Sequence, residues 1–171
     1  MKSMLLMILA SVTMIAACGQ QDKSKRPSPP ATATQTLANG TTLTIDYSQP
    51  SVKGRTIGKD LEPMPGKVWR TGANEATVFA VSKNVQVEGK PLASGKYGLF
   101  TIMDGDNWTI IFNKTWNQWG AFNYKEADDV LRVSVKGKKA PKFAEKMTFT
   151  IAKDGTVSLL WGDHQVDFHV K

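Results

Sequence analysis

The chain has 171 residues, 41% of them hydrophobic, which is enough for one domain with a proper core. Its formal net charge is +7 at pH 7, but the lysines are spread along the chain rather than gathered in an arm, so no nucleic-acid-binding segment is indicated. A single cysteine excludes both a disulfide framework and a cysteine-based metal site.

Residues 1–18 have the pattern of a secretory leader with a lipid attachment site. Met1-Lys-Ser is a short basic region, and the apolar run that follows it ends at Ala17, too short for a membrane span of about 20 residues. The sequence Ile15-Ala-Ala-Cys18 resembles the bacterial lipobox, in which the cysteine is acylated and becomes the mature N-terminus. We therefore expect a lipoprotein signal peptide at 1–17 and an acyl anchor on Cys18. The anchor would hold the protein to a membrane of the bacterial cell envelope, on the periplasmic face or at the cell surface; the alternative is a soluble secreted protein with a free thiol.

Residues 19–36 are polar and rich in Ser, Pro, Gln and Lys, with Pro27, Pro29 and Pro30 close together. Such a composition buries too little apolar surface to order the chain. We expect a lipidated flexible tether at 18–37, followed by a single β-sandwich domain at 38–171.

From residue 38 onward, apolar residues recur with a period of two, which predicts strands. Leu43, Ile45 and Tyr47 alternate with polar residues. The same alternation returns in four further segments, at 77–81, 85–87, 130–135 and 147–151. No helical stripe of useful length is present. About nine or ten short strands separated by turn signals indicate an all-β fold, either an antiparallel β-sandwich or a flattened barrel.

Residues 96–103 and 106–113 are two alternating apolar runs joined by Asp104-Gly105, which is a strong hairpin signal. A two-residue loop at this point pairs Leu99 with Ile110. Both faces of the hairpin are largely apolar, which predicts a central position in the sheet.

The C-terminal residues predict a meander of strands. A three-residue loop at Lys153-Asp-Gly155, with Gly155 in the left-handed conformation, pairs Phe149 with Leu159 and keeps the apolar side chains on one face. Gly162-Asp163 is interpreted as a second turn.

The segment from Asn113 to Tyr124 is the best candidate for a functional surface, because it packs four aromatics and four side-chain amides into twelve residues without a helix or strand period. A second segment, 68–77, carries an arginine and a carboxylate. If both segments emerge at the same end of the sandwich, they form a wall of indoles, amides and charges that suits a glycan or a peptide. The candidate ligand-binding residues are Trp69, Arg70, Asn74, Glu75, Asn113, Lys114, Trp116, Asn117, Gln118 and Trp119.

Other interpretations of these segments stay open. The aromatic residues can form a satellite core that pins a long loop, with the amides satisfying backbone groups inside it. Arg70 and Glu75 can equally form a buried ion pair. An enzyme would need an acid and a base, for which Glu75 with Asp128 or Asp129 is the available combination, as in a hydrolase of an envelope or scavenged polymer.

No further chemistry is indicated by the remaining residues. His164 and His169 are expected at strand ends or edges, on opposite sides, so no metal site is expected from them. The sequence contains no nucleophile elbow and no phosphate-binding glycine loop before a helix, and no cofactor is expected.

Three segments resemble a known family. They are Val68-Trp-Arg-Thr-Gly-Ala-Asn-Glu-Ala-Thr77, Gly95-Lys-Tyr-Gly-Leu-Phe-Thr-Ile102 and Asn113-Lys-Thr-Trp-Asn-Gln-Trp-Gly-Ala-Phe122. Together they are similar to the bacterial domain-of-unknown-function family twenty-nine eleven, over Thr42 to Val170. The resemblance implies a secreted or lipid-anchored protein of Bacteroidetes-type bacteria with a compact β-rich domain, and it supplies no reaction. We expect a non-enzymatic envelope module that binds a glycan, a peptide or a partner protein, with a hydrolase or a purely structural protein as alternatives.

Overall fold

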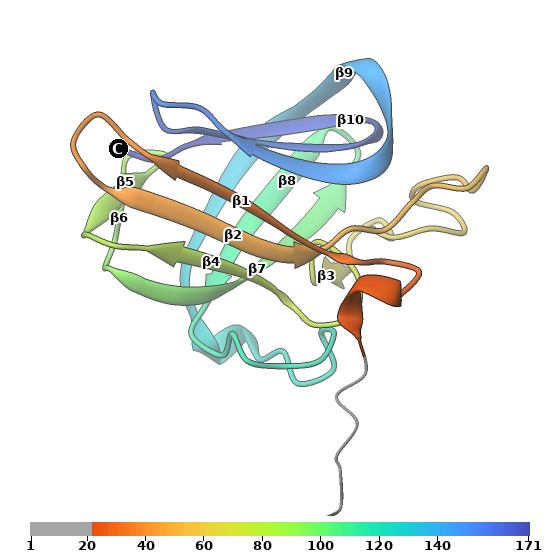
Figure 1. Cartoon of the computed structure of the whole chain (residues 1–171), viewed down its shortest axis with the longest axis horizontal. Helices are drawn as coiled ribbons and strands as arrows, with labels where there is room; N and C mark the ends of the chain where they lie inside the picture. Colours follow the sequence, from red (N-terminus) through yellow and green to blue (C-terminus); the bar gives the residue numbers. More distant parts are fainter. Residues whose placement is uncertain (1–21) are drawn as a thin grey trace, which may run out of the picture.

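The computed structural model describes residues 22–171, so the expected signal peptide and Cys18 lie outside the described residues. The described part contains ten strands and two short 3-10 helices (Figure 1). In chain order they are η1 (Lys23–Lys25), β1 (Pro30–Thr36), β2 (Thr42–Ser48), β3 (Val68–Trp69), β4 (Thr77–Val81), β5 (Val85–Val87), β6 (Lys90–Leu92), β7 (Gly95–Asp104), β8 (Asn107–Asn113), η2 (Glu126–Asp128), β9 (Asp129–Ile151) and β10 (Thr156–His169). No membrane-spanning helix is found among residues 22–171.

Eight of the strands form one antiparallel sheet that curls into a half-barrel (Figure 1). The order is β1-β2-β4-β7-β8-β9-β10, and β3 pairs with β7 beside this path. Strands β5 and β6 form a separate hairpin. The curl brings β1, at one edge, into contact with β9. The prediction of an all-β antiparallel fold is confirmed.

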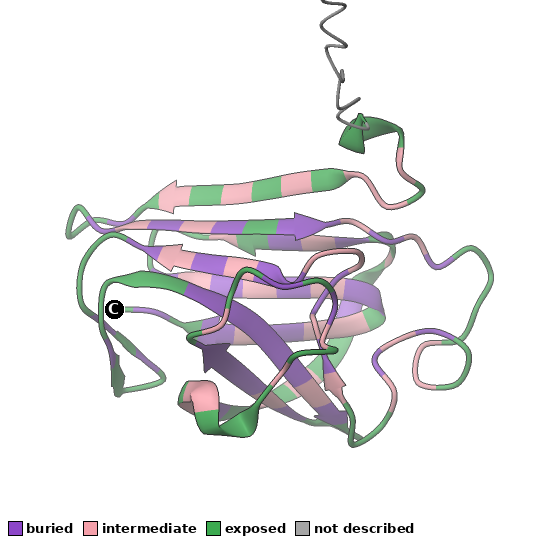
Figure 2. Cartoon of the chain, turned by 90° about the horizontal axis from the view of Figure 1, so that it is seen from below, coloured by how far each residue is buried: buried purple, intermediate pink, exposed green. Residues whose placement is uncertain are grey.

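The inner side of the curled sheet encloses the main core (Figure 2). Aromatic rings fill its centre, where Phe79 packs edge-on against Phe112 with 5.1 Å between ring centroids. The predicted alternation is confirmed in β2, where Leu43, Ile45 and Tyr47 are buried. Burial of these side chains removes apolar surface from water, and this is the main source of the fold's stability.

The outer face of β7 and β8 is covered as well. Phe100 and Ile111 form a second, smaller cluster there with Ala76. Tyr124 packs on it, with 5.0 Å between the ring centroids of Tyr124 and Phe100. The two candidate loops, around residues 70–76 and 113–124, cover the outer face of this hairpin. This cover explains why both faces of the hairpin are apolar, as the sequence predicted for a central position.

The β7–β8 hairpin forms as predicted, but its register differs by two residues. Asp104 pairs with Asn107 and Leu99 with Phe112, so the turn residues are Gly105-Asp106. Within this turn only Gly105 has a positive φ, +57°, as in a type II′ turn, which places glycine first. A shift by two residues keeps every side chain on its original face, so the buried set is the one expected.

The predicted loop at Lys153-Asp-Gly155 is confirmed, and the predicted turn at Gly162 is wrong. Gly155 has φ +89°, and Phe149 pairs with Leu159 as predicted. At Gly162 the chain does not reverse, because β10 continues to His169 along β9. Gly162 has φ +58° and lies at a register shift between the two long strands, which is a β-bulge. A left-handed glycine suits a bulge as well as a turn, so the local sequence does not distinguish them.

The expected tether at 18–37 is corrected over its second half, because Pro30–Thr36 forms β1 and pairs with β2 along its length. Ala31 and Ala33 pack against the main core. On the other face, the hydroxyls of Thr34 and Thr44 lie 3.1 Å apart in a hydrogen bond. An edge strand gains its order mostly from backbone pairing, so small and polar side chains suffice. The folded domain therefore begins before residue 38.

Candidate functional site

The two candidate loops meet, although they are far apart in the sequence. The Ala76 N–H donates to the Gln118 carbonyl at 3.0 Å, and the Gly120 N–H donates to the Asn74 carbonyl at 3.0 Å. Glu75 and Trp119 form an isolated antiparallel bridge between these bonds. Backbone groups thus fix the loop at 113–124 to the segment at 70–76, and we call the former the aromatic loop.

Three of the predicted ligand-binding residues are buried and are removed from any binding surface. Trp69 is 2% exposed, and its indole N–H donates to the Gly72 carbonyl at 3.1 Å. Asn113 is fully buried, and Gln118 is 8% exposed. The side-chain amides of Asn113 and Gln118 make hydrogen bonds within the loop, as the alternative interpretation of these residues expected.

Asn113 is the main anchor of the aromatic loop. Its Nδ2 donates to the Lys125 carbonyl at 3.0 Å and to Asp129 Oδ1 at 2.7 Å. Its Oδ1 accepts the Thr115 N–H at 2.9 Å. One side chain therefore joins the first and last residues of the loop to the start of β9, and a buried amide with these partners is costly to remove.

A second polar group closes the loop from the other side. Asp128 accepts the Thr115 hydroxyl at 2.9 Å and pairs with Lys114 Nζ at 3.1 Å. The Thr115 hydroxyl and then Lys114 lower the pKa of Asp128. Asp129 binds the Tyr124 hydroxyl at 2.6 Å and Arg132 Nε at 2.6 Å. Burial and the contact with Asp129 raise the pKa of Tyr124 to about 12, so its hydroxyl stays protonated and donating.

Held in this way, the aromatic loop exposes three large apolar side chains, which we call the aromatic ridge. Trp116 is 37% exposed, Trp119 53% and Phe122 85%. Two cations lie over the indoles: Lys96 Nζ is 5.3 Å from the centroid of Trp116, and the Arg26 guanidinium is 5.8 Å from that of Trp119. Contacts of this kind are favourable and keep the rings in place.

The remaining polar candidates lie around the ridge. Asn117 is exposed, and Lys114 is exposed while paired with Asp128. Asn74 has φ +57°, and its Nδ2 donates to the Ser28 carbonyl at 2.9 Å. Asn74 therefore ties the chain that leads into β1 to this end of the molecule.

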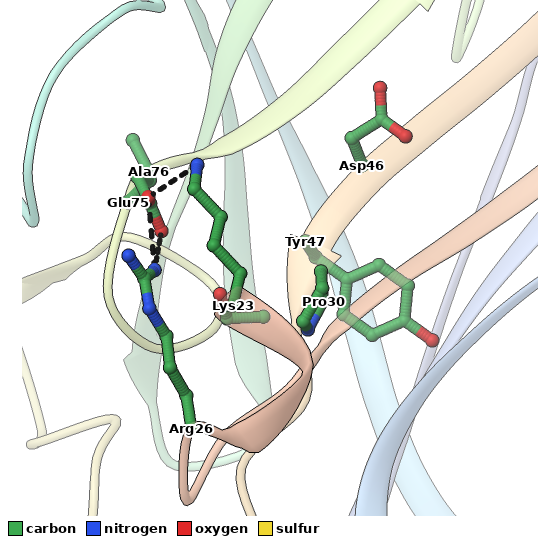
Figure 3. Close-up of a pocket in the computed structure, with 8 residues that line it drawn as sticks. Lys23, Arg26, Pro30, Asp46, Tyr47, Glu75 and Ala76 are labelled. Atoms are coloured by element: carbon green, nitrogen blue, oxygen red, sulfur yellow. Dashed lines mark hydrogen bonds and ion pairs between the residues drawn. The ribbon is translucent and has the colours of Figure 1, made fainter. Parts of the chain in front are cut away.

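The ion pair between Glu75 and Arg70 that the sequence allowed does not form. Glu75 pairs with Lys23 Nζ at 3.0 Å and with Arg26 Nη1 at 3.0 Å, both from the η1 region (Figure 3). Burial acts to raise the pKa of Glu75, but its backbone N–H and the two cations hold it down, to about 2. Nothing in the sequence pattern pointed to Lys23 and Arg26, because they lie in a stretch with the composition of a linker.

We expect the docking of η1 on Glu75 to be complete above pH 4.5 and to be lost as the pH falls through about 2, since folding lowers this pKa from 4.5 to about 2. An NMR titration of the Glu75 carboxyl carbon measures the value directly. Arg26→Gln should raise it, whereas Lys153→Gln, in the turn before Gly155, should leave it unchanged. A wild-type pKa near 4.5 would contradict the ion pairs.

The cavity beside Glu75 is small, about 170 Å³, and Lys23, Arg26, Pro30, Asp46 and Tyr47 line it with Glu75 (Figure 3). Cavities that hold small molecules usually measure about 300–1,000 Å³. The second carboxylate that lines the cavity beside Glu75 is that of Asp46, rather than Asp128 or Asp129. Glu75 is thus paired with Lys23 and Arg26 at this cavity, whereas Asp128 and Asp129 do not line it and are held by other partners.

The histidines lie away from this site. His164 packs on Trp108, with 6.0 Å between ring centroids, and His169 Nδ1 lies 3.2 Å from Glu88 Oε1. Across residues 22–171, no group of three or more potential metal ligands comes together.

Comparison with known proteins places the chain in a family without a known activity. No curated protein and no solved structure shows a significant match. The family match covers residues 28–170, so it includes β1 and begins ahead of Thr42, where the resemblance was expected to start. The chain belongs to the family described as "Protein of unknown function (DUF2911)".

Proposed function

We propose that the chain is a non-enzymatic binding module whose contact surface is the aromatic ridge. The observation that carries this proposal is the exposure of Trp119, 53%, and Phe122, 85%, on a loop that is held by the hydrogen bonds of the buried Asn113 amide. Exposed aromatic side chains on an ordered support are typical of interaction surfaces, where rigid rings supply contact area at low entropic cost.

A partner protein or peptide is the ligand that fits this surface best. Phe122 has no hydrogen-bonding group, so its binding energy must come from an apolar pocket on the partner. Arg26 and Lys96 lie over the indoles, and the exposed Lys114 belongs to the same loop, which favours a partner with acidic residues around that pocket.

A glycan is the second candidate, because the exposed Asn117 amide lies in the loop between the two indoles and such groups bind sugar hydroxyls. It ranks lower, since a cation already occupies one face of each indole. A hydrolase receives less support. Glu75, with its pKa near 2, is a poor general acid at neutral pH, and Asp128 is held by Lys114 and Thr115.

Arrays of peptides and glycans, probed with the full chain, test the proposal. We expect peptide spots to bind the wild type, and Trp119→Ala to weaken that binding at least about tenfold, or about 1.4 kcal/mol. Phe143→Ala is the control, since Phe143 is half exposed on β9, outside the ridge. Binding that Trp119→Ala leaves unchanged, or no bound spot at all, would count against the proposal.

We propose further that Cys18 carries an acyl anchor and that the domain works at a membrane of the cell envelope. The support is the lipobox-like Ile15-Ala-Ala-Cys18 after an apolar run. Metabolic labelling with an alkyne fatty acid should tag the wild type, and Cys18→Ser should abolish the label. Equal labelling of both proteins would overturn this assignment.

A further inference from the structure

A second cavity, lined in part by Arg70, Gly72 and Ala73 of the 70–76 segment, plays no part in the proposed function. It measures about 280 Å³, which is close to the lower end of the usual range for small-molecule sites. Leu61, Met64 and Trp161 contribute apolar surface to its wall. The charged groups that line it are Arg55, Asp60, Glu62 and Arg70.

Arg70 is the unusual member of this set. Its Nε is buried and has no hydrogen-bond partner, and no carboxylate of residues 22–171 lies within ion-pair distance of its guanidinium. Burial lowers the pKa of Arg70, and the charge of Glu62 offsets part of this effect. A guanidinium stays protonated in proteins, so the buried, unpartnered Nε of this half-buried cation carries a cost.

The other three arginines of the chain all have partners. Arg26 pairs with Glu75, and Arg132 pairs with Asp129 and Glu126. Arg55 lines the same cavity as Arg70, but it donates to the carbonyls of Val52 and Ser51 at 3.0 and 2.7 Å. Two of its donors therefore fix a loop, whereas Arg70 makes no side-chain hydrogen bond or ion pair within residues 22–171, although its Nε is buried.

The backbone next to Arg70 is held in an unfavourable conformation. Thr71 is β-branched and fully buried, yet its φ is +52°. Two hydrogen bonds hold it there: the Thr71 hydroxyl donates to the Thr101 hydroxyl at 3.1 Å, and the Thr77 hydroxyl donates to the Thr71 carbonyl at 2.7 Å. Strain of this kind persists only where the surroundings enforce it, and it is common at binding sites. Here it fixes the point from which the Arg70 side chain leaves the backbone.

The acids of the cavity restrict the class of ligand. Asp60 accepts the Thr56 N–H with one oxygen, and Glu62 accepts the Met64 N–H with one oxygen. The second oxygen of each carboxylate makes no hydrogen bond within the described residues. Two carboxylates beside two guanidinium groups disfavour a dianion such as phosphate. They favour a molecule that carries one carboxylate and one ammonium.

We propose that this cavity binds a free α-amino acid, whose carboxylate pairs with the Arg70 guanidinium and whose ammonium is bound by Asp60 and Glu62. A bidentate contact between a guanidinium and a carboxylate gives both donors of one edge of Arg70 a partner. Among the apolar residues that line the cavity, the partly exposed Met64 provides surface for the side chain of the amino acid.

Calorimetric titration of the full chain with each standard L-amino acid tests this site. We expect at least one amino acid to bind, and its amide, which lacks the carboxylate, to bind at least tenfold more weakly. Its N-acetyl form, which lacks the ammonium, should be weakened similarly. Inorganic sulfate should not compete. If no amino acid binds, or if sulfate competes as an equal, the proposal fails, and this result leaves the test of the aromatic ridge unaffected.

Two variants separate a ligand-binding arginine from a structural one. Arg70→Met should abolish amino-acid binding while leaving the melting temperature unchanged or higher, because it removes a half-buried cation whose buried Nε has no partner. Arg132→Met should lower the melting temperature, because it breaks the ion pairs with Asp129 and Glu126. It should leave amino-acid binding unchanged, because it keeps the cavity. Arg70→Lys, which keeps the charge, should bind at least tenfold more weakly. Loss of folding in Arg70→Met, or unchanged binding in Arg70→Lys, would overturn the assignment.

Discussion

Gly155→Ala is expected to cost about 3–5 kcal/mol of the free energy of unfolding. Gly155 has φ +89°, where an L-residue is strained, and an added Cβ would collide with the carbonyl oxygen of Val170. The Val170 N–H also donates to the Gly155 carbonyl at 2.9 Å, and the Val170 side chain is fully buried. The substitution therefore has to displace the end of the chain and expose Val170.

Gly54→Ala is the matched control for this prediction. Gly54 has φ +70°, but an added Cβ there meets no atom within 4 Å. It should cost only the backbone strain, roughly 1 kcal/mol. Urea unfolding of the two variants and the wild type measures both values. Equal losses would show that the close contact with Val170 contributes nothing.

Asn113→Ala should be the most damaging single change in the aromatic loop, with a loss of about 2–4 kcal/mol. The fully buried amide makes three hydrogen bonds, and its removal leaves the Lys125 carbonyl, Asp129 and the Thr115 N–H without this partner. The loop then loses the bonds that hold its two ends together. Binding through the aromatic ridge should fall with it, although Asn113 itself faces no solvent.

Asn117→Ala provides the comparison within the same loop. Asn117 is exposed, so its removal should change stability by less than about 0.5 kcal/mol. Denaturant unfolding gives the stabilities, and amide exchange of residues 114–124 shows whether the loop has become mobile. If Asn113→Ala is as mild as Asn117→Ala, the loop is not held by this amide.

The strand pattern could be predicted because alternation reports burial directly. Leu43, Ile45 and Tyr47 lie inside, as their spacing indicated. The register of the β7–β8 hairpin could not be fixed, since a slip of two residues preserves both faces and changes only the cross-strand pairs and the turn, from Asp104-Gly105 to Gly105-Asp106. β1 was missed for another reason: a strand of alanine and threonine buries too little apolar surface to differ from a linker in composition.

The meeting of the two candidate loops could be predicted, but not which partner each of their residues contacts. The sequence identified the two loops, and the bridge between Glu75 and Trp119 shows that they meet. It could not separate Asn113 from Asn117, because identical side chains four residues apart differ only in their burial. It also could not find the partners of Glu75, since Lys23 and Arg26 reach it from a segment 49 or more residues away.

Photo-cross-linking at position 122 is the most direct test of the aromatic ridge as a docking surface for a partner protein. Phe122 would be replaced by benzoylphenylalanine in the full chain, in the bacterium that makes it, with the same replacement at Phe143 as the comparison. We predict one cross-linked product of defined mass from position 122 and none from position 143, because Phe122 is 85% exposed on an anchored loop. No product from position 122, or the same products from both positions, would contradict the proposed docking surface.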